Sequence, residues 1–160
     1  MEERRCVATR IYLDMCCYNR PYDDQSQLKV AMETEAKLYI QDLVREGKID
    51  LVGSFILDFE CSRNPFEMRK RTIFDFLASN MKEYVGSERS DVLKTKIVEL
   101  MRAGIKEKDA THLASAIYAG CDYFISTDIR LLKHKTDEIR LVTPVAFVME
   151  LEGNDDGQYC

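Results

Sequence analysis

Two aspartates stand where buried strands are expected to end. Asp14 closes the apolar run RIYLD at 10–14, and Asp128 follows the run YFIS at 123–126. In a parallel α/β sheet, functional side chains collect at the carboxyl ends of the strands, so these two carboxylates are expected to meet in one crevice. The plainer alternative is that each aspartate only caps a loop or a helix.

Two further acids lie on expected helices. Glu60 belongs to the apolar segment SFILDFEC, where a buried glutamate would need a partner such as a metal ion; the alternative is that it faces solvent beside Asp58. Asp109 stands near the start of a helix, where an acid also favours the helix dipole. His112 follows one turn later, and a histidine there is more often packed and hydrogen-bonded than a direct ligand.

These carboxylates suggest a site for a hard cation. Oxygen ligands without cysteine or histidine suit Mg²⁺ or Mn²⁺, which activate water and neutralise charge on a phosphodiester. We expect the carboxylates of Asp14, Glu60, Asp109 and Asp128 to line one pocket at the strand ends.

Alternating strand and helix patterns must position this pocket. Strands are expected at 10–14, 49–52, 83–85, 123–126 and 139–142, and helices at 25–46, from Ser54, from Asn64, at 90–103, at 106–119 and from Thr143-Pro144. This alternation predicts an α/β fold with a parallel sheet flanked by helices on both faces. We expect a single domain over 1–152 and a polar tail over 153–160.

Local signals set several helix boundaries. Ser54 is expected to cap the helix that carries Glu60. Asn64 and Pro65 are expected to cap and open the next helix, with Glu67 as the acid of a capping box. Gly47, Gly104 and Gly120 are expected to end the helices that precede them.

Composition excludes several classes of protein. An apolar fraction of 46% and a charged fraction of 32% are those of a soluble globular protein, and no run reaches the about 18 apolar residues of a membrane helix. The six cysteines include no C-x-x-C pair, so free thiols in a cytoplasmic protein are expected rather than a zinc site. The net charge of −5 argues against broad, non-specific nucleic-acid binding.

The order of the motifs resembles the PIN domain family, which includes the toxin ribonucleases of toxin–antitoxin pairs. The motifs are strand-D, S-x-x-x-x-x-E, D-A-x-H-x-x-x-A and S-T-D, and the resemblance runs from IYLDMCCYNRP through DATHLASAIYAGCDYFISTD to IRLVTP. It implies a three-layer fold and metal-dependent hydrolysis of RNA. The family's acids carry over onto Asp14, Glu60, Asp109 and Asp128, and Thr127 matches its common hydroxyl.

The resemblance also implies partners and shows one departure. It implies an RNA substrate, an antitoxin protein and a homodimer. The family often has Thr or Ser and then Asn after the first aspartate, whereas this chain has Met15 and Cys16. A basic group close to Glu60 (Arg63, Arg69, Lys70 and Arg71) is expected either to hold the RNA backbone or to form a solvated helix face paired with Glu67 or Asp75.

Two other functions fit part of the pattern. Aspartate phosphotransferases also place an aspartate after the first strand, but they need a second aspartate where this chain has Cys16. A non-catalytic PIN-like module that binds RNA or protein fits the apolar pair Met15 and Cys16. Metal binding without RNA cleavage would favour that module over the nuclease.

Overall fold

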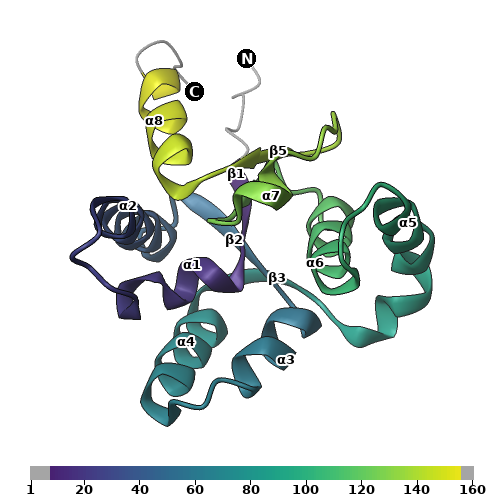
Figure 1. Cartoon of the computed structure of the whole chain (residues 1–160), viewed down its shortest axis with the longest axis horizontal. Coiled ribbons are helices and arrows are strands. Elements are labelled where there is room, and N and C mark those ends of the chain that lie inside the picture. Colours follow the sequence, from purple (N-terminus) through teal and green to yellow (C-terminus); the bar gives the residue numbers. More distant parts are fainter. Residues whose placement is uncertain (1–7, 156–160) are drawn as a thin grey trace, which may run out of the picture.

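The computed structural model describes residues 8–155, and within them five strands form one sheet (Figure 1). The strands are β1 (Thr9–Leu13), β2 (Ile49–Ser54), β3 (Met81–Val85), β4 (Tyr123–Ile125) and β5 (Arg140–Val142). Their order across the sheet is β3-β2-β1-β4-β5, and all four neighbouring pairs are parallel. The predicted parallel α/β sheet is therefore confirmed.

Eight α-helices and two short 3-10 helices join these strands in the described part of the chain. They are α1 (Met15–Asn19), η1 (Arg20–Tyr22), α2 (Leu28–Arg45), α3 (Phe55–Ser62), α4 (Glu67–Asn80), η2 (Ser87–Arg89), α5 (Ser90–Arg102), α6 (Glu107–Tyr118), α7 (Ile129–Leu132) and α8 (Pro144–Asp155). No helix within 8–155 is long and apolar enough to cross a membrane.

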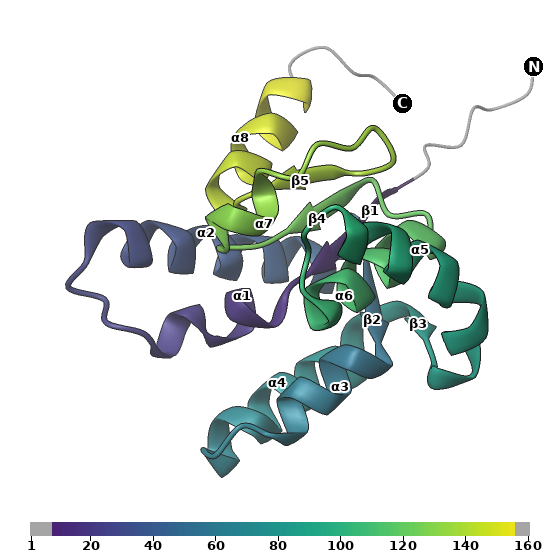
Figure 2. The same ribbon diagram turned by 45° about the vertical axis from the view of Figure 1, so that its right-hand side comes forward.

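The helices form layers around the sheet. Helix α2 packs against α8, and α5 packs against α6. Figure 1 shows these two pairs on opposite sides of the strands. Helices α3 and α4 form a third packed pair, which projects away from the sheet in Figure 2. The central strands are thus covered on both faces, whereas the edge strand β3 is largely exposed.

The central strands are buried because they are apolar on both faces. In β1, Ile11, Tyr12 and Leu13 are at most 1% exposed, and in β2 Leu51 and Val52 are fully buried. Parallel strands covered by helices have this continuous apolar character. Tyr12 differs from its apolar neighbours in these strands, because it brings a hydroxyl group into the core.

Glycine ends three of the helices through the same geometry. Gly47, Gly104 and Gly120 follow α2, α5 and α6 and have positive φ angles of 73°, 99° and 71°. After each glycine, the next residue donates its N–H to a carbonyl five residues earlier, from Lys48 to Leu43, from Ile105 to Leu100 and from Cys121 to Ala116. This is the Schellman motif, and the predicted helix ends are confirmed.

Several boundaries differ from the sequence prediction, among them the start of α2, which is Leu28 rather than residue 25, and the two differences that bear on α4 and α8 follow. Helix α4 begins at Glu67, and its N-cap Phe66 makes no side-chain capping bond. Asn64 does not cap α4, because its Oδ1 accepts a hydrogen bond from the Phe66 N–H and its Nδ2 donates to Asn19. Helix α8 continues to Asp155, so the expected tail begins inside a helix, and residues 156–160 lie outside the described part.

We predict that Gly47→Ala lowers the free energy of unfolding by about 1 kcal/mol, because a Cβ disfavours the positive φ. Gly153→Ala is the matched control, since Gly153 lies in α8 without a positive φ and an added Cβ would meet nothing within 4 Å. It should leave the stability unchanged or raise it by up to about 1 kcal/mol. Urea denaturation measures both values, and equal effects at the two positions would contradict the helix-end argument.

Candidate active site

Asp14 lies at the carboxyl end of β1 and caps α1. Its Oδ1 accepts a hydrogen bond from the Met15 N–H at 2.8 Å, and its Oδ2 accepts one from the Ser126 hydroxyl at 2.8 Å. The Cys16 thiol lies 3.5 Å from the same Oδ2. The family's usual Thr or Ser and Asn are absent at positions 15 and 16, and Asp14 is held by the backbone of α1, by Cys16 and by Ser126.

Ser126 joins the ends of β1 and β4. It is fully buried, and its hydroxyl oxygen accepts a hydrogen bond from the Asp128 N–H at 3.1 Å while it donates to Asp14. Asp128 caps α7 through Oδ1, which accepts from the Arg130 N–H at 3.0 Å. The capping interpretation is therefore correct for both Asp14 and Asp128, and capping leaves Oδ2 of Asp128 without a hydrogen bond from the described residues.

A line of hydrogen bonds begins in α3, passes through the side chains of β2, β1 and α6, and returns to α3. The Leu57 N–H donates to Ser54 Oγ, Ser54 Oγ lies 2.6 Å from the Tyr12 hydroxyl, and that hydroxyl lies 2.6 Å from His112 Nδ1. His112 Nε2 is hydrogen-bonded to Glu60 Oε1. Ser54 caps α3 as predicted, and His112, 1% exposed, is the packed and hydrogen-bonded histidine that the sequence favoured.

The two ends of this line set its direction. An ionised Glu60 only accepts hydrogen bonds, so the His112 Nε2–H must donate to it. With a neutral ring, Nδ1 then accepts from the Tyr12 hydroxyl, which in turn accepts from Ser54. Nε2 of His112 also lies 3.9 Å from Asp14 Oδ1, so His112 stands between two of the four acids.

Asp109 differs from the other three acids because its carboxylate has no hydrogen bond within residues 8–155. It is half-buried near the start of α6. Burial raises the pKa of Asp109, the negative charges of Asp14, Asp128 and Glu60 raise it further, and His112 opposes them. The four acids are therefore close enough for their charges to interact.

The four acids do not line one pocket as the sequence predicted, because two cavities divide them. Asp109 and Asp128 line one cavity of about 450 Å³ together with Lys106 and Arg130. Glu60 lines another of about 360 Å³, whose lining also includes Arg63 and Arg69. Asp14 lines neither, since it is nearly buried and held by hydrogen bonds from Ser126 and from the backbone of α1.

The acids fit a hard cation in their chemistry but not as a preformed cage. In the described part of the chain, no group of three or more His, Cys, Asp or Glu side chains is arranged to hold a metal ion. The donors nevertheless are carboxylate oxygens, and Asp109 is a half-buried carboxylate that accepts no hydrogen bond from the described residues and is repelled by three other acids. A cation would relieve that repulsion, and small side-chain rotations would be needed to coordinate it.

Sequence reasoning missed the residues that hold the acids in place. Ser126 was part of an expected strand and of the S-T-D motif, and Tyr12 was part of the buried run RIYLD, but neither hydroxyl group was given a role. A buried hydroxyl needs a hydrogen-bond partner, so a Ser or Tyr in such a run indicates a buried polar contact. The partners themselves are 42 to 112 residues away in the chain and cannot be read from local spacing.

We predict that Asp109→Asn raises the free energy of unfolding at pH 7 in buffer with a chelator. The raised pKa means that the folded state holds the Asp109 proton more tightly than the unfolded chain, so stability is lost as pH rises through the folded pKa. The gain in the variant should therefore vanish near about pH 3, where both states are protonated. Urea denaturation at the two pH values measures it, with the exposed Asp91→Asn as control.

A variant that is less stable than the parent at pH 7 would contradict this prediction. That result would mean that the favourable interaction of Asp109 with the α6 dipole outweighs burial and carboxylate repulsion.

Comparisons with known proteins bear on the fold. No protein-family model and no curated protein matches the chain. Among solved structures, a chain in the crystal structure of VapBC2 from Rickettsia felis, bound to a DNA fragment from their promoter, superposes with a TM-score of 0.54. The match covers 83% of this chain and 97% of that chain at 12% identity. Together with the all-parallel five-stranded sheet and its helical layers, this likeness shows that the chain has the PIN-like α/β fold that its motifs predicted.

Proposed function

We propose that this protein is a metal-dependent endoribonuclease that hydrolyses RNA phosphodiester bonds. The observation that carries the proposal is the carboxylate of Asp109, which is half-buried, has no hydrogen bond from the described residues and interacts with the charges of three other acids. A carboxylate in this environment lowers the stability of the metal-free protein and raises its affinity for a cation.

The four acids have distinct roles in this proposal. Asp14 and Asp109 are the main ligands of Mg²⁺ or Mn²⁺, and Asp128 and Glu60 complete the shell or orient water. When bound, the ion supplies an activated water and neutralises charge on the phosphate and the leaving oxygen. Ser126 fixes one oxygen of Asp14, and His112 fixes one oxygen of Glu60, so each leaves its acid oriented before RNA arrives.

The basic residues near Glu60 supply a site for the RNA backbone. Arg69 stacks against Phe66 at 4.0 Å and Tyr22 at 4.8 Å, and Arg63 stacks against Phe59 at 5.1 Å. Neither arginine is paired with an acid in the described part of the chain, so both retain their donors for phosphate. Lys70 instead pairs with Glu67 at 3.5 Å, which favours the solvated-face interpretation for that residue alone.

The alternative is a non-catalytic PIN-like module that binds RNA or protein. The absence of a preformed group of metal ligands in residues 8–155 is the observation that favours it. An aspartate phosphotransferase fits less well, because the residue two positions after Asp14 is Cys16, whose thiol contacts Asp14 and Ser126.

We also propose that the protein is the toxin of a toxin–antitoxin pair in the cytoplasm. Support comes from its likeness in fold to a chain of VapBC2 and from the motifs of its sequence. The free thiols of Cys16, Cys17, Cys61 and Cys121 fit a reducing compartment. A small reading frame that overlaps the start of the gene would supply the antitoxin.

We predict that the pure protein cleaves mixed RNAs with Mn²⁺ and not with chelator, and that Asp14→Asn and Asp109→Asn each abolish this cleavage, a loss of roughly a hundred-fold or more. Asparagine keeps the shape and, at position 14, the capping oxygen, but it removes the charge that a hard cation needs. Gel analysis of end-labelled RNA measures the rates.

Asp91→Asn is the matched control, because Asp91 is an exposed acid in the first turn of α5. Cleavage at the parent rate by either site variant would show the ligand assignment to be wrong. Metal binding by calorimetry without any RNA cleavage would favour the non-catalytic module.

We predict that changing Arg63, Arg69 and Arg71 to glutamine weakens RNA binding and flattens its salt dependence. Each lost phosphate contact should reduce the slope of log affinity against log salt by roughly 0.7 for a single strand. Fluorescence anisotropy with labelled RNA at several salt concentrations gives the slope. The affinity for Mn²⁺ should barely change.

A second triple variant separates the local effect from the loss of charge. Changing the exposed residues Lys29, Lys94 and Arg102 to glutamine removes the same charge far along the chain from Glu60. An equal slope in the parent and the arginine variant would show that these arginines do not contact RNA and belong to a solvated helix face.

We predict that the protein is a homodimer at micromolar concentration through the apolar surface of α2 and α8. In this surface Leu28, Met32 and Met149 are 75%, 48% and 68% exposed. Met149→Glu should shift sedimentation to the monomer, because it would bury a charge at the interface. Met68→Glu is the control, since Met68 is 85% exposed on α4, and a parent protein that sediments only as monomer would remove the claim.

A further inference from the structure

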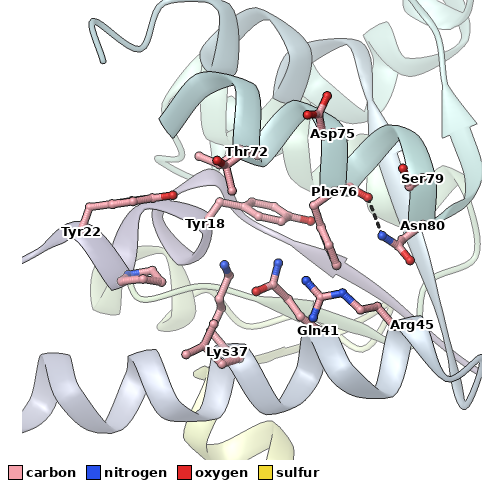
Figure 3. A pocket seen from close by; sticks show the side chains of 13 residues that line it. Tyr18, Tyr22, Lys37, Gln41, Arg45, Thr72, Asp75, Phe76, Ser79 and Asn80 are labelled. Atoms are coloured by element: carbon pink, nitrogen blue, oxygen red, sulfur yellow. Dashed lines mark hydrogen bonds between the residues drawn. The ribbon is translucent and has the colours of Figure 1, made fainter. Parts of the chain in front are cut away.

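A cavity between α2 and α4 collects positive and polar groups that the proposed nuclease site does not use. It has a volume of about 430 Å³, within the range of small-molecule sites. Figure 3 shows Lys37, Gln41 and Arg45 projecting from α2 toward Tyr18 and Phe76, with the Asp75 carboxylate pointing away from Lys37. The cavity thus has a basic floor and an aromatic wall.

Lys37 is the unusual member of this group because the residue is nearly buried and no anion of the described residues pairs with its ammonium. The residue is 5% exposed, and no carboxylate of the described residues lies within ion-pair distance of it. Glu33, one turn earlier on α2, pairs with Arg20 at 2.9 Å instead. The ammonium lies over the Tyr18 ring, whose centroid is 5.5 Å away. Buried charges are ordinarily paired, so this one lacks its expected partner.

The surroundings of Lys37 are short of partners as well. The Tyr18 hydroxyl is buried and makes no hydrogen bond within residues 8–155. Burial lowers the pKa of Lys37 to about 8, and the charge of Arg45 lowers it too. An anion in the cavity would relieve both effects, because it would pair with Lys37 and screen it from Arg45.

The walls indicate what kind of anion fits. The cavity is lined by Ile73, Phe76 and Tyr22 as well as by Lys37 and Arg45. Its surface therefore has an apolar part and a basic part. A bare inorganic ion would leave the apolar part in contact with water. A ligand with an acidic head and an apolar or flat body covers both parts.

We propose that the cavity between α2 and α4 binds a small organic anion, whose phosphate or carboxylate group pairs with Lys37 and Arg45. This site is separate from the four acids, and it goes beyond the proposed cleavage of RNA. It does not require a metal ion. Its ligand is recognised by charge at one end and by contact with aromatic side chains at the other.

Isothermal titration calorimetry on the full chain in chelator tests the proposal with four probes: adenosine 5′-monophosphate, inorganic phosphate, succinate and adenosine. At least one of the three anions should bind at millimolar concentration or below, and adenosine should bind more weakly than its monophosphate. Binding of the phosphates alone identifies a phosphate head, and binding of succinate identifies a carboxylate head. Failure of all three anions to bind would overturn the proposal, as would equal binding of adenosine and its monophosphate.

Two variants locate the binding. Lys37→Met, which keeps the length of the side chain without its charge, should weaken anion binding by roughly ten- to a hundred-fold. Arg45→Gln should weaken it too, and this more exposed residue tests the site even if position 37 proves sensitive for folding. Lys29→Met is the matched control, because Lys29 is exposed on the same helix. Anion binding that is equally strong in the parent, Lys37→Met and Arg45→Gln would overturn the proposal.

Discussion

Strand β1 is hydrogen-bonded on both sides by parallel strands, and this pairing decides where the chemistry of the molecule lies. Since β2, β1 and β4 run in the same direction, the residues that follow them emerge at one edge of the sheet. The Asp14 N–H still donates to the Ile125 carbonyl at 2.9 Å, so the pairing extends to the residue that bears the first acid. The contact of Asp14 with Ser126 then follows directly from the register of β1 and β4.

Carboxylates gathered at one edge of the sheet repel one another. Hydrogen-bond donors in the site offset this repulsion for three of the four acids but not for Asp109. Asp14 is held by a hydroxyl and an N–H, Asp128 by the N–H groups of α7, and Glu60 by His112. Each of these donors gives its carboxylate a hydrogen bond in the folded protein. Asp109 has no such donor in the described residues, so the repulsion from the other carboxylates is not offset there by a hydrogen bond.

The fold and the acids followed from local signals, whereas the arrangement of the acids did not. Apolar runs located β1, β2, β4 and β5, and Gly47, Gly104 and Gly120 located helix ends, because both signals act within a few residues. Strand β3 is largely exposed, and only its part at 83–85 was expected. Asn64 resembled a helix cap, but its side chain serves the Phe66 N–H and Asn19, which lies 45 residues away in the chain. The support of Glu60 by His112 spans 52 residues and depends on how α3 and α6 pack, which no local pattern contains.

Asp14 and Asp128 cap α1 and α7, whereas Glu60 and Asp109 cap nothing. Selection for a folded chain therefore retains an oxygen-bearing residue at positions 14 and 128 even where no reaction is under selection. At position 60 it retains an acceptor for the buried His112, whereas at 109 it favours loss of the charge. In a lineage that abandons catalysis, Asp109 should drift first, so its identity is the better record of activity among descendants of this sequence.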